Sequence, residues 1–165
     1  MTYFEETQYF RQKWLWIIIL FFPLFSIYGL YKQVLMGIPI GDHPMSDKGV
    51  VWFSVLIGLG LPFLFWNLKL KIKVTKEGLY YQFFPIHLKY RLIPFEDIKS
   101  YKARTYEPLK EFGGWGIRFG FKGKAYNVSG DKGLQLVLNN ERQVLFGSQR
   151  HKELAKAMSK ANKES

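Results

Sequence analysis

The chain has 165 residues, enough for one domain and a small addition, and contains no cysteine. The lack of cysteine excludes disulfide scaffolds, thiolate metal sites and cysteine nucleophiles. The formal net charge is +11, and all of it belongs to residues 68–165, because basic and acidic side chains balance in residues 1–67. Such a basic half favours an anionic partner, either a membrane surface or a nucleic acid.

Two uncharged, mainly apolar runs follow a short amino-terminal segment, residues 1–13. They occupy residues 14–31 and 49–67, and a helix needs about 17–25 apolar residues to cross a bilayer. Aromatic residues stand near both ends of each run, where membrane helices meet the headgroups. Two buried helices of a soluble protein are the alternative, but neither run has a polar stripe of helical period. We therefore predict two transmembrane helices joined by a short external loop, residues 32–48.

The distribution of basic residues predicts how these helices are oriented. Four lysines fall in the eight residues KLKIKVTK (69–76) after the second run, whereas the loop 32–48 carries two basic residues. Basic residues concentrate on the cytoplasmic side, which places residues 68–165 in the cytoplasm. Two crossings return the chain to its starting side. We expect a multi-pass protein of the cell (inner) membrane with both termini cytoplasmic.

From residue 68 onward the apolar residues recur with the period of two that is typical of β-strands. We expect strands at 68–74, 79–84, 87–93, 98–106, 114–121, 133–138 and 142–147, and a further short strand at 124–128. Turns are expected at Gly78, with positive φ, and across Asn139-Asn140-Glu141, where asparagine tolerates the left-handed conformation. The pattern predicts an antiparallel β-barrel or sandwich of about seven strands.

A carboxy-terminal amphipathic helix is expected over residues 149–162, after an N-cap at Ser148. One side of this helix carries Leu154, Ala157, Met158 and Ala161. This apolar side predicts that the helix closes the β domain, residues 68–165.

Four segments resemble small bacterial membrane proteins that carry two spans and then a pleckstrin-homology-like (PH-like) domain. The segments are IPFEDIKSYKARTY (93–106), EFGGWGIRFG (111–120), AYNVSGDKGLQLVL (125–138) and LFGSQRHKEL (145–154). The resemblance covers about residues 68–160, and the spans match in layout. It implies seven strands in two near-orthogonal sheets with a closing helix. The family is largely uncharacterised, so the resemblance implies a fold and no particular activity.

The glycine-rich stretch EFGGWGIRFGFKG (111–123) raises the question of a phosphate-binding loop. The Walker pattern fails because Ala125 stands where a hydroxyl is needed, and the dinucleotide pattern fails because a strand follows instead of a helix. We interpret Gly116 and Gly120 as positions of a bulge or of close backbone approach. On this interpretation the inward face carries Trp115, Ile117 and Phe119, and Arg118 points the other way.

The sequence contains no catalytic constellation. The histidines His43, His87 and His151 have no metal-ligand spacing, and the adjacent Glu96 and Asp97 point apart in an extended segment. We therefore expect no enzyme, no cofactor and no metal.

A non-enzymatic binding role at the membrane follows from the basic half. For an anionic lipid surface the candidates are Lys69, Lys71, Lys73 and Lys76. For a ligand or a protein partner they are Arg104, Trp115 and Arg118. A membrane-bound scaffold or assembly factor for a membrane protein complex is the alternative function. Nucleic acid is not the expected partner, because the basic domain adjoins the membrane. The sequence leaves the oligomeric state open.

Overall fold

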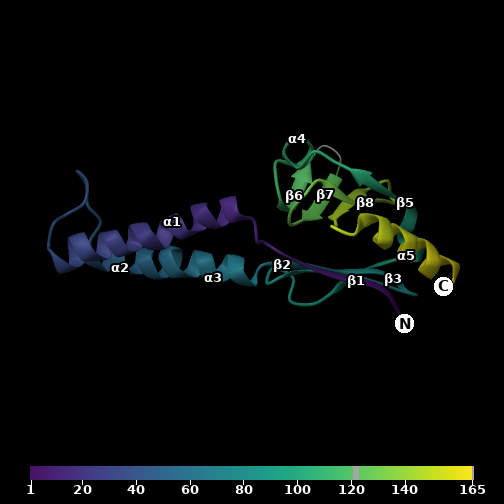
Figure 1. Cartoon of the computed structure of the whole chain (residues 1–165), viewed down its shortest axis with the longest axis horizontal. Helices are drawn as coiled ribbons and strands as arrows, with labels where there is room; N and C mark the ends of the chain where they lie inside the picture. Colours follow the sequence, from purple (N-terminus) through teal and green to yellow (C-terminus); the bar gives the residue numbers. More distant parts are fainter. Residues whose placement is uncertain (121–122, 165) are drawn as a thin grey trace. The chain divides into compact units, whose positions relative to one another are not determined.

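The computed structural model describes residues 1–120 and 123–164, and its contacts divide into two units (Figure 1). The helical unit is Phe10–Asn67, and the β unit combines Met1–Tyr9 with Leu68–Ser165. Residues 1–9 of the expected amino-terminal segment, residues 1–13, belong to the β unit. The β unit takes its strands from both sides of the helical unit in the sequence, because the first residues form a strand.

The helical unit contains two long helices, each partly π-helical. The first consists of α1 (Lys13–Gly29) and η1 (Leu30–Leu35), and the second of α2 (Asp47–Phe53), η2 (Ser54–Leu59) and α3 (Gly60–Asn67). Both are long and apolar enough to cross a membrane, and only 17% of the most apolar window of each is buried. Their apolar side chains thus remain exposed, as a lipid-facing surface requires. The two predicted helices are present and extend a few residues beyond the predicted bounds.

Small residues allow the two long helices to approach each other. A Cβ atom at Gly58 would lie 2.5 Å from Ser26 Oγ, so glycine is needed at this contact. Trp16 and Trp66 meet edge to face with ring centroids 5.8 Å apart. These contacts pair the helices as an antiparallel hairpin.

Among the described residues, the β unit has nine strands in two sheets. The first sheet has the order β1-β2-β3-β4, from β1 (Thr2–Tyr9), β2 (Lys69–Thr75), β3 (Gly78–Phe84) and β4 (Arg91–Pro94). The second has the order β5-β8-β9-β7-β6, from β5 (Ile98–Thr105), β6 (Gly116–Gly120), β7 (Gly123–Asn127), β8 (Lys132–Leu138) and β9 (Gln143–Gly147). The short helices are η3 (Phe95–Asp97) and α4 (Pro108–Phe112), and α5 (His151–Lys163) ends the chain.

Strand β1 is the main departure from the prediction. It pairs antiparallel with β2 from Thr2–Thr75 to Tyr9–Lys69. Its buried side chains are Phe4, Glu6 and Gln8, two of them polar. Most of the amino-terminal segment thus forms one of the two edge strands of the first sheet.

Other predictions about the β part also need correction. Of the expected barrel or sandwich, the closed barrel is not formed, since the two sheets do not close. The pairing is also not wholly antiparallel, because β7 pairs parallel with β9. The strand expected at 87–93 is reduced to β4, because residues 85–90 form a loop. Positive φ in the β8–β9 turn occurs at Glu141 (62°), while Gly78 has the predicted positive φ (145°). Ser148 does not cap α5, whose N-cap is Arg150.

The core of the β unit lies between the sheets and α5. Strand β2 alternates as predicted, with Leu70, Ile72 and Val74 fully buried. The apolar face predicted for the terminal helix is also confirmed, because Leu154, Ala157, Met158 and Ala161 are buried. Helix α5 contacts strands of both sheets. The two ends of the chain meet in this unit, where the Tyr3 hydroxyl donates to Glu164 Oε2 at 2.6 Å (Figure 1).

Candidate lipid-facing surface

Three of the four predicted lysines share the outer face of β2, because side chains alternate along a strand. Lys69, Lys71 and Lys73 are half-buried on that face, whereas Leu70 between the first two is 0% exposed. Lys76 lies in the exposed turn between β2 and β3. We call these four lysines the lysine face.

Aromatic rings flank two members of the lysine face. Lys69 Nζ lies 5.3 Å from the ring centroid of Phe84 and 5.9 Å from that of Tyr9. Lys71 Nζ lies 5.9 Å from the ring centroid of Tyr90. The rings attract the ammonium groups and cover the apolar stems, while the charged ends reach the surface. The face therefore joins positive charge to amphipathic rings, as residues at a headgroup layer do.

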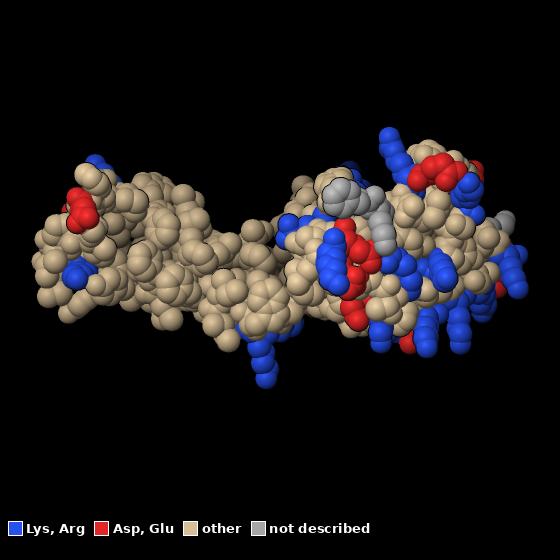
Figure 2. All heavy atoms as spheres, turned by 90° about the horizontal axis from the view of Figure 1, so that it is seen from above, with Lys and Arg blue, Asp and Glu red and all other residues tan. Residues whose placement is uncertain are grey.

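No member of the lysine face forms an ion pair within the described residues, although Glu5 pairs with Lys73 across the two strands. Among residues 1–120 and 123–164, none of these four ammonium groups has a carboxylate oxygen within 4.0 Å. Figure 2 shows Lys and Arg side chains crowded over the β unit, while most of the helical unit carries no charge. Positive charge without a partner in the protein is available to an anionic surface.

Both chain connections to the helical unit leave the first sheet at the same row of residues. Lys69 pairs with Tyr9 on one side and with Phe84 on the other. Helix α3 ends at Asn67, two residues before Lys69, and α1 begins four residues after Tyr9. Because a residue spans at most about 3.6 Å, the Cα atom of Lys69 lies within about 7 Å of that of Asn67. The connection alone thus keeps this row close to the helix end.

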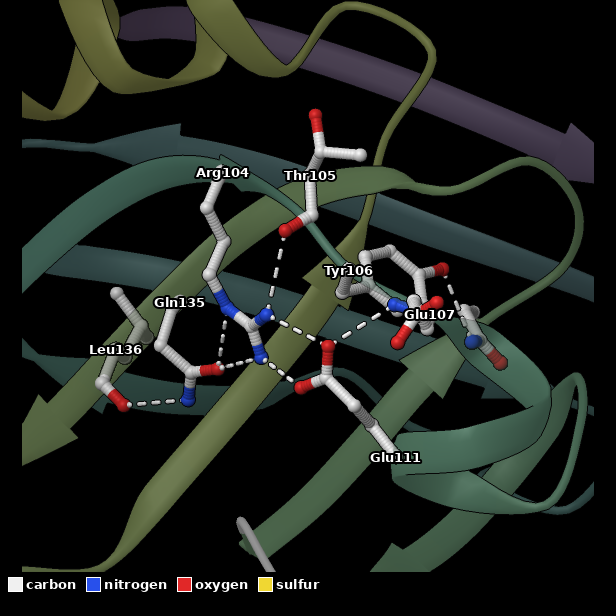
Figure 3. Close-up of polar contacts among 8 residues, drawn as sticks. Arg104, Thr105, Tyr106, Glu107, Glu111, Gln135 and Leu136 are labelled. Carbon is white, nitrogen blue, oxygen red and sulfur yellow. Dashed lines mark hydrogen bonds and ion pairs between the residues drawn. The ribbon is translucent and has the colours of Figure 1, made fainter.

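Arg104 is held in a network on the second sheet (Figure 3). Its Nε and Nη2 donate to Gln135 Oε1 at 3.2 and 3.0 Å, and its Nη1 donates to Thr105 O at 3.3 Å. Nη1 and Nη2 also donate to the two carboxylate oxygens of Glu111 at 3.1 and 2.8 Å. The backbone N–H of Glu107 donates to the same carboxylate at 2.9 Å. The five bonds that Arg104 donates match the five N–H groups of its guanidinium, which favours a structural role for this residue.

We expect Arg104→Lys to lower the free energy of unfolding of the β unit by about 2 kcal/mol, because lysine cannot reproduce the planar fork. The side chains of Arg104 and Glu111 are only 23% and 11% exposed, so water replaces the lost bonds poorly. Chemical denaturation of the full-length protein measures the change. Arg142→Lys is the control, because Arg142 is exposed and should change stability by less than about 0.5 kcal/mol. Equal stability of the two variants would refute the structural role.

Trp115 and Arg118 lie together at the start of β6. Arg118 Nε donates to the Trp115 carbonyl at 2.8 Å, and Trp115 Nε1 donates to the Gly130 carbonyl at 2.9 Å. Neither of these bonds joins them to Arg104. Their predicted role in binding a ligand or partner stays a prediction.

Glycines of the glycine-rich stretch allow a left-handed backbone conformation and a close backbone approach, as interpreted from the sequence. Gly113 ends α4 in the left-handed conformation, with φ 69°. A Cβ atom at Gly120 would lie 2.0 Å from the Glu111 carbonyl oxygen, so only glycine fits there. The inward face predicted for this strand is wrong at Phe119, which is 77% exposed. That side chain lies against Lys124, whose Nζ is 4.8 Å from the ring centroid.

A cleft in the β unit was not foreseen. It has a volume of about 540 Å³, and its basic lining residues are Arg91, Lys124 and Arg142. Its apolar wall consists of Tyr81, Ile93, Phe119, Tyr126, Leu138 and Val144. The described lining contains no carboxylate. This arrangement can hold an anion against an aromatic wall. The three basic residues are far apart in the sequence, and no local pattern brings them together.

Burial shifts the pKa values of Tyr81 and His87 beside this cleft. Burial, together with a hydrogen bond to the Tyr126 hydroxyl at 3.4 Å, raises the pKa of Tyr81 to about 12. Burial lowers the pKa of His87, and the positive charges of Arg91 and Lys124 lower it further. His87 is therefore neutral at pH 7, and its Nδ1 accepts a bond from the Phe83 backbone N–H at 3.3 Å.

The chain thus combines a helical hairpin of membrane-spanning length with a two-sheet β unit, whose strands come from both sides of the hairpin in the sequence. The chain belongs to a family of unknown function (DUF6141), whose profile matches residues 2–164 and so includes both units. No curated protein and no solved structure matches the chain.

Proposed function

We propose that this is a non-enzymatic integral membrane protein that holds its β unit against the anionic cytoplasmic surface of the cell (inner) membrane. The observation that carries the proposal is the lysine face, which forms no ion pair within 4.0 Å among the described residues and starts two residues after α3. Each lysine near an anionic leaflet contributes about 1 kcal/mol of attraction. Since the helix already tethers the unit, these lysines need only orient it.

The pairing of β1 with β2 supports the proposed topology. The two strands lie on either side of the helical unit in the sequence, yet they are neighbours in one sheet. A hairpin that crosses the bilayer twice returns the chain to the side from which it came, as this pairing requires. The lysine-rich β2 favours the cytoplasm as that side.

The resemblance to PH-like domains is consistent with a binding role, although a fold alone does not specify a ligand. In the alternative role, a scaffold or assembly factor, the β unit would hold a membrane protein partner instead of lipid. The two roles differ in whether purified protein and lipid are sufficient for docking.

The test measures the approach of the β unit to lipid in the purified full-length protein. The chain has no native cysteine, so a nitroxide at Thr7→Cys reports from the exposed position opposite Lys71. In nanodiscs we expect phosphatidylglycerol, compared with phosphatidylcholine alone, to reduce the accessibility of this label to a water-soluble nickel complex several-fold. A label at Thr105→Cys on β5 is the control and should change little. Equal accessibility of Thr7 in both lipids would reject lipid docking and favour the scaffold role.

A further inference from the structure

The loop between β3 and β4, residues 85–90, exposes apolar side chains at the row that adjoins both connections to the helical unit. Ile86 is 61% exposed and Leu88 is 77% exposed. The loop begins directly after Phe84, which pairs with Lys69, and Lys69 follows the end of α3 by two residues. Single exposed aliphatic residues are common in soluble proteins. Here two of them occur in one short loop, which begins directly after the strand residue that pairs with Lys69.

The conformation of the loop is fixed from inside the β unit. His87 lies between the two aliphatic residues and is only 6% exposed. Its backbone N–H donates to the Phe83 carbonyl at 2.8 Å, and its ring lies 5.8 Å from that of Tyr81 and 5.7 Å from that of Tyr126. Gln82 Nε2 also donates to the Leu88 carbonyl at 2.9 Å. With His87 held inward, the side chains before and after it are presented to the outside.

The residues around the loop are of the types that occur at a bilayer interface. Lys89 is exposed, and Tyr90 is 41% exposed beneath the ammonium group of Lys71. Membrane-surface segments usually combine aliphatic side chains that insert, aromatic rings at headgroup depth and lysines that reach anionic phosphates. A protein partner is less well matched, because the tips are flanked by lysines and the unit is tethered beside lipid.

We propose that Ile86 and Leu88 insert into the interface of the leaflet to which the β unit is tethered, and so anchor the unit beside its lysine face. This inference rests on the proposed function and adds an apolar contact to it. Removing these side chains from water is favourable in proportion to their area and does not depend on salt, unlike the attraction of the lysines. The two contributions can therefore be separated.

The experiment uses nitroxides at Ile86→Cys and Leu88→Cys in the full-length protein, in nanodiscs that contain phosphatidylglycerol. The matched control is Leu109→Cys on α4, which replaces another aliphatic residue that is 67% exposed. We expect the ratio of oxygen accessibility to nickel-complex accessibility to be at least fivefold higher at positions 86 and 88 than at 109. Equal ratios at the three positions would overturn the inference. So would labels at 86 and 88 that are immobile but excluded from oxygen, since these would indicate a protein contact.

The Thr7 label distinguishes failure of loop insertion from failure of the proposed lipid docking. Protection of Thr7 by anionic lipid, with positions 86 and 88 still accessible to nickel, would reject insertion and retain docking through the lysine face. A second variant, Ile86→Ser with Leu88→Ser, tests the same point without a label in the loop. In this variant we expect 0.5 M salt to abolish the protection of Thr7, whereas the unaltered loop retains part of it. Unchanged salt sensitivity would also overturn the inference.

Discussion

Deleting residues 2–9 is expected to destabilise the β unit by several kcal/mol, although these residues precede the helical unit in the sequence. The deletion removes the edge strand β1 and the buried ring of Phe4, which is 6% exposed. It also removes the Glu6 carboxylate, which accepts bonds from Ser148 Oγ at 2.5 Å and from the Gln149 N–H at 3.0 Å. A loss of this size is comparable with the whole stability of a typical domain, about 5–15 kcal/mol.

Limited proteolysis of the full-length and truncated proteins in the same detergent measures this effect, since the β unit is rich in lysine and arginine. We expect trypsin to cleave the truncated β unit at least tenfold faster, while the helical unit survives. Thr7→Ala is the control, because Thr7 is exposed on the outer face of β1 and should leave the rate unchanged. Cleavage of the truncated protein at the original rate would mean that β1 contributes nothing to the fold.

The sequence did not predict β1 because its buried face is polar. An alternating strand is recognised by apolar residues at every second position, but here Glu6 and Gln8 occupy inward positions. The hydrogen bonds of these side chains come from residues more than a hundred positions away, since Gln8 Nε2 donates to the Gly147 carbonyl at 2.7 Å and Glu6 accepts from Ser148. No local pattern contains that information. In β2, by contrast, lysines alternate with Leu and Ile, so the inner and outer faces were predicted correctly.

The same division between local and distant causes applies to the loop 85–90. Its residues look like part of a strand because His87, Lys89 and Arg91 alternate with apolar ones. The structure reverses these roles, because aromatic rings from β3 and β7 bury His87 and leave Leu88 outside. The lysine face could thus be predicted from the sequence, whereas the apolar loop beside it depends on tertiary contacts.

Replacing the lysine face by glutamine at Lys69, Lys71, Lys73 and Lys76 is expected to abolish the protection of the Thr7 label by anionic lipid. At about 1 kcal/mol for each lysine, the ratio of docked to undocked β unit should fall roughly 10³-fold. Raising the salt of the unaltered protein toward 1 M, where the screening length is only about 3 Å, should remove the part of the protection that the lysines supply and leave the part that Ile86 and Leu88 supply. The purified protein is reconstituted after folding, so the change does not act through membrane insertion.

A matched variant separates the position of these charges from their number. Glutamine at Lys132, Lys152, Lys156 and Lys163, one on β8 and three on α5, lowers the formal charge from +11 by the same four units. All four control lysines are exposed. If the lysine face orients the β unit, the control variant should keep most of its protection, because its charges lie farther along the chain from the tether. Equal loss in the two variants would mean that net charge, and not this face, draws the unit to the membrane.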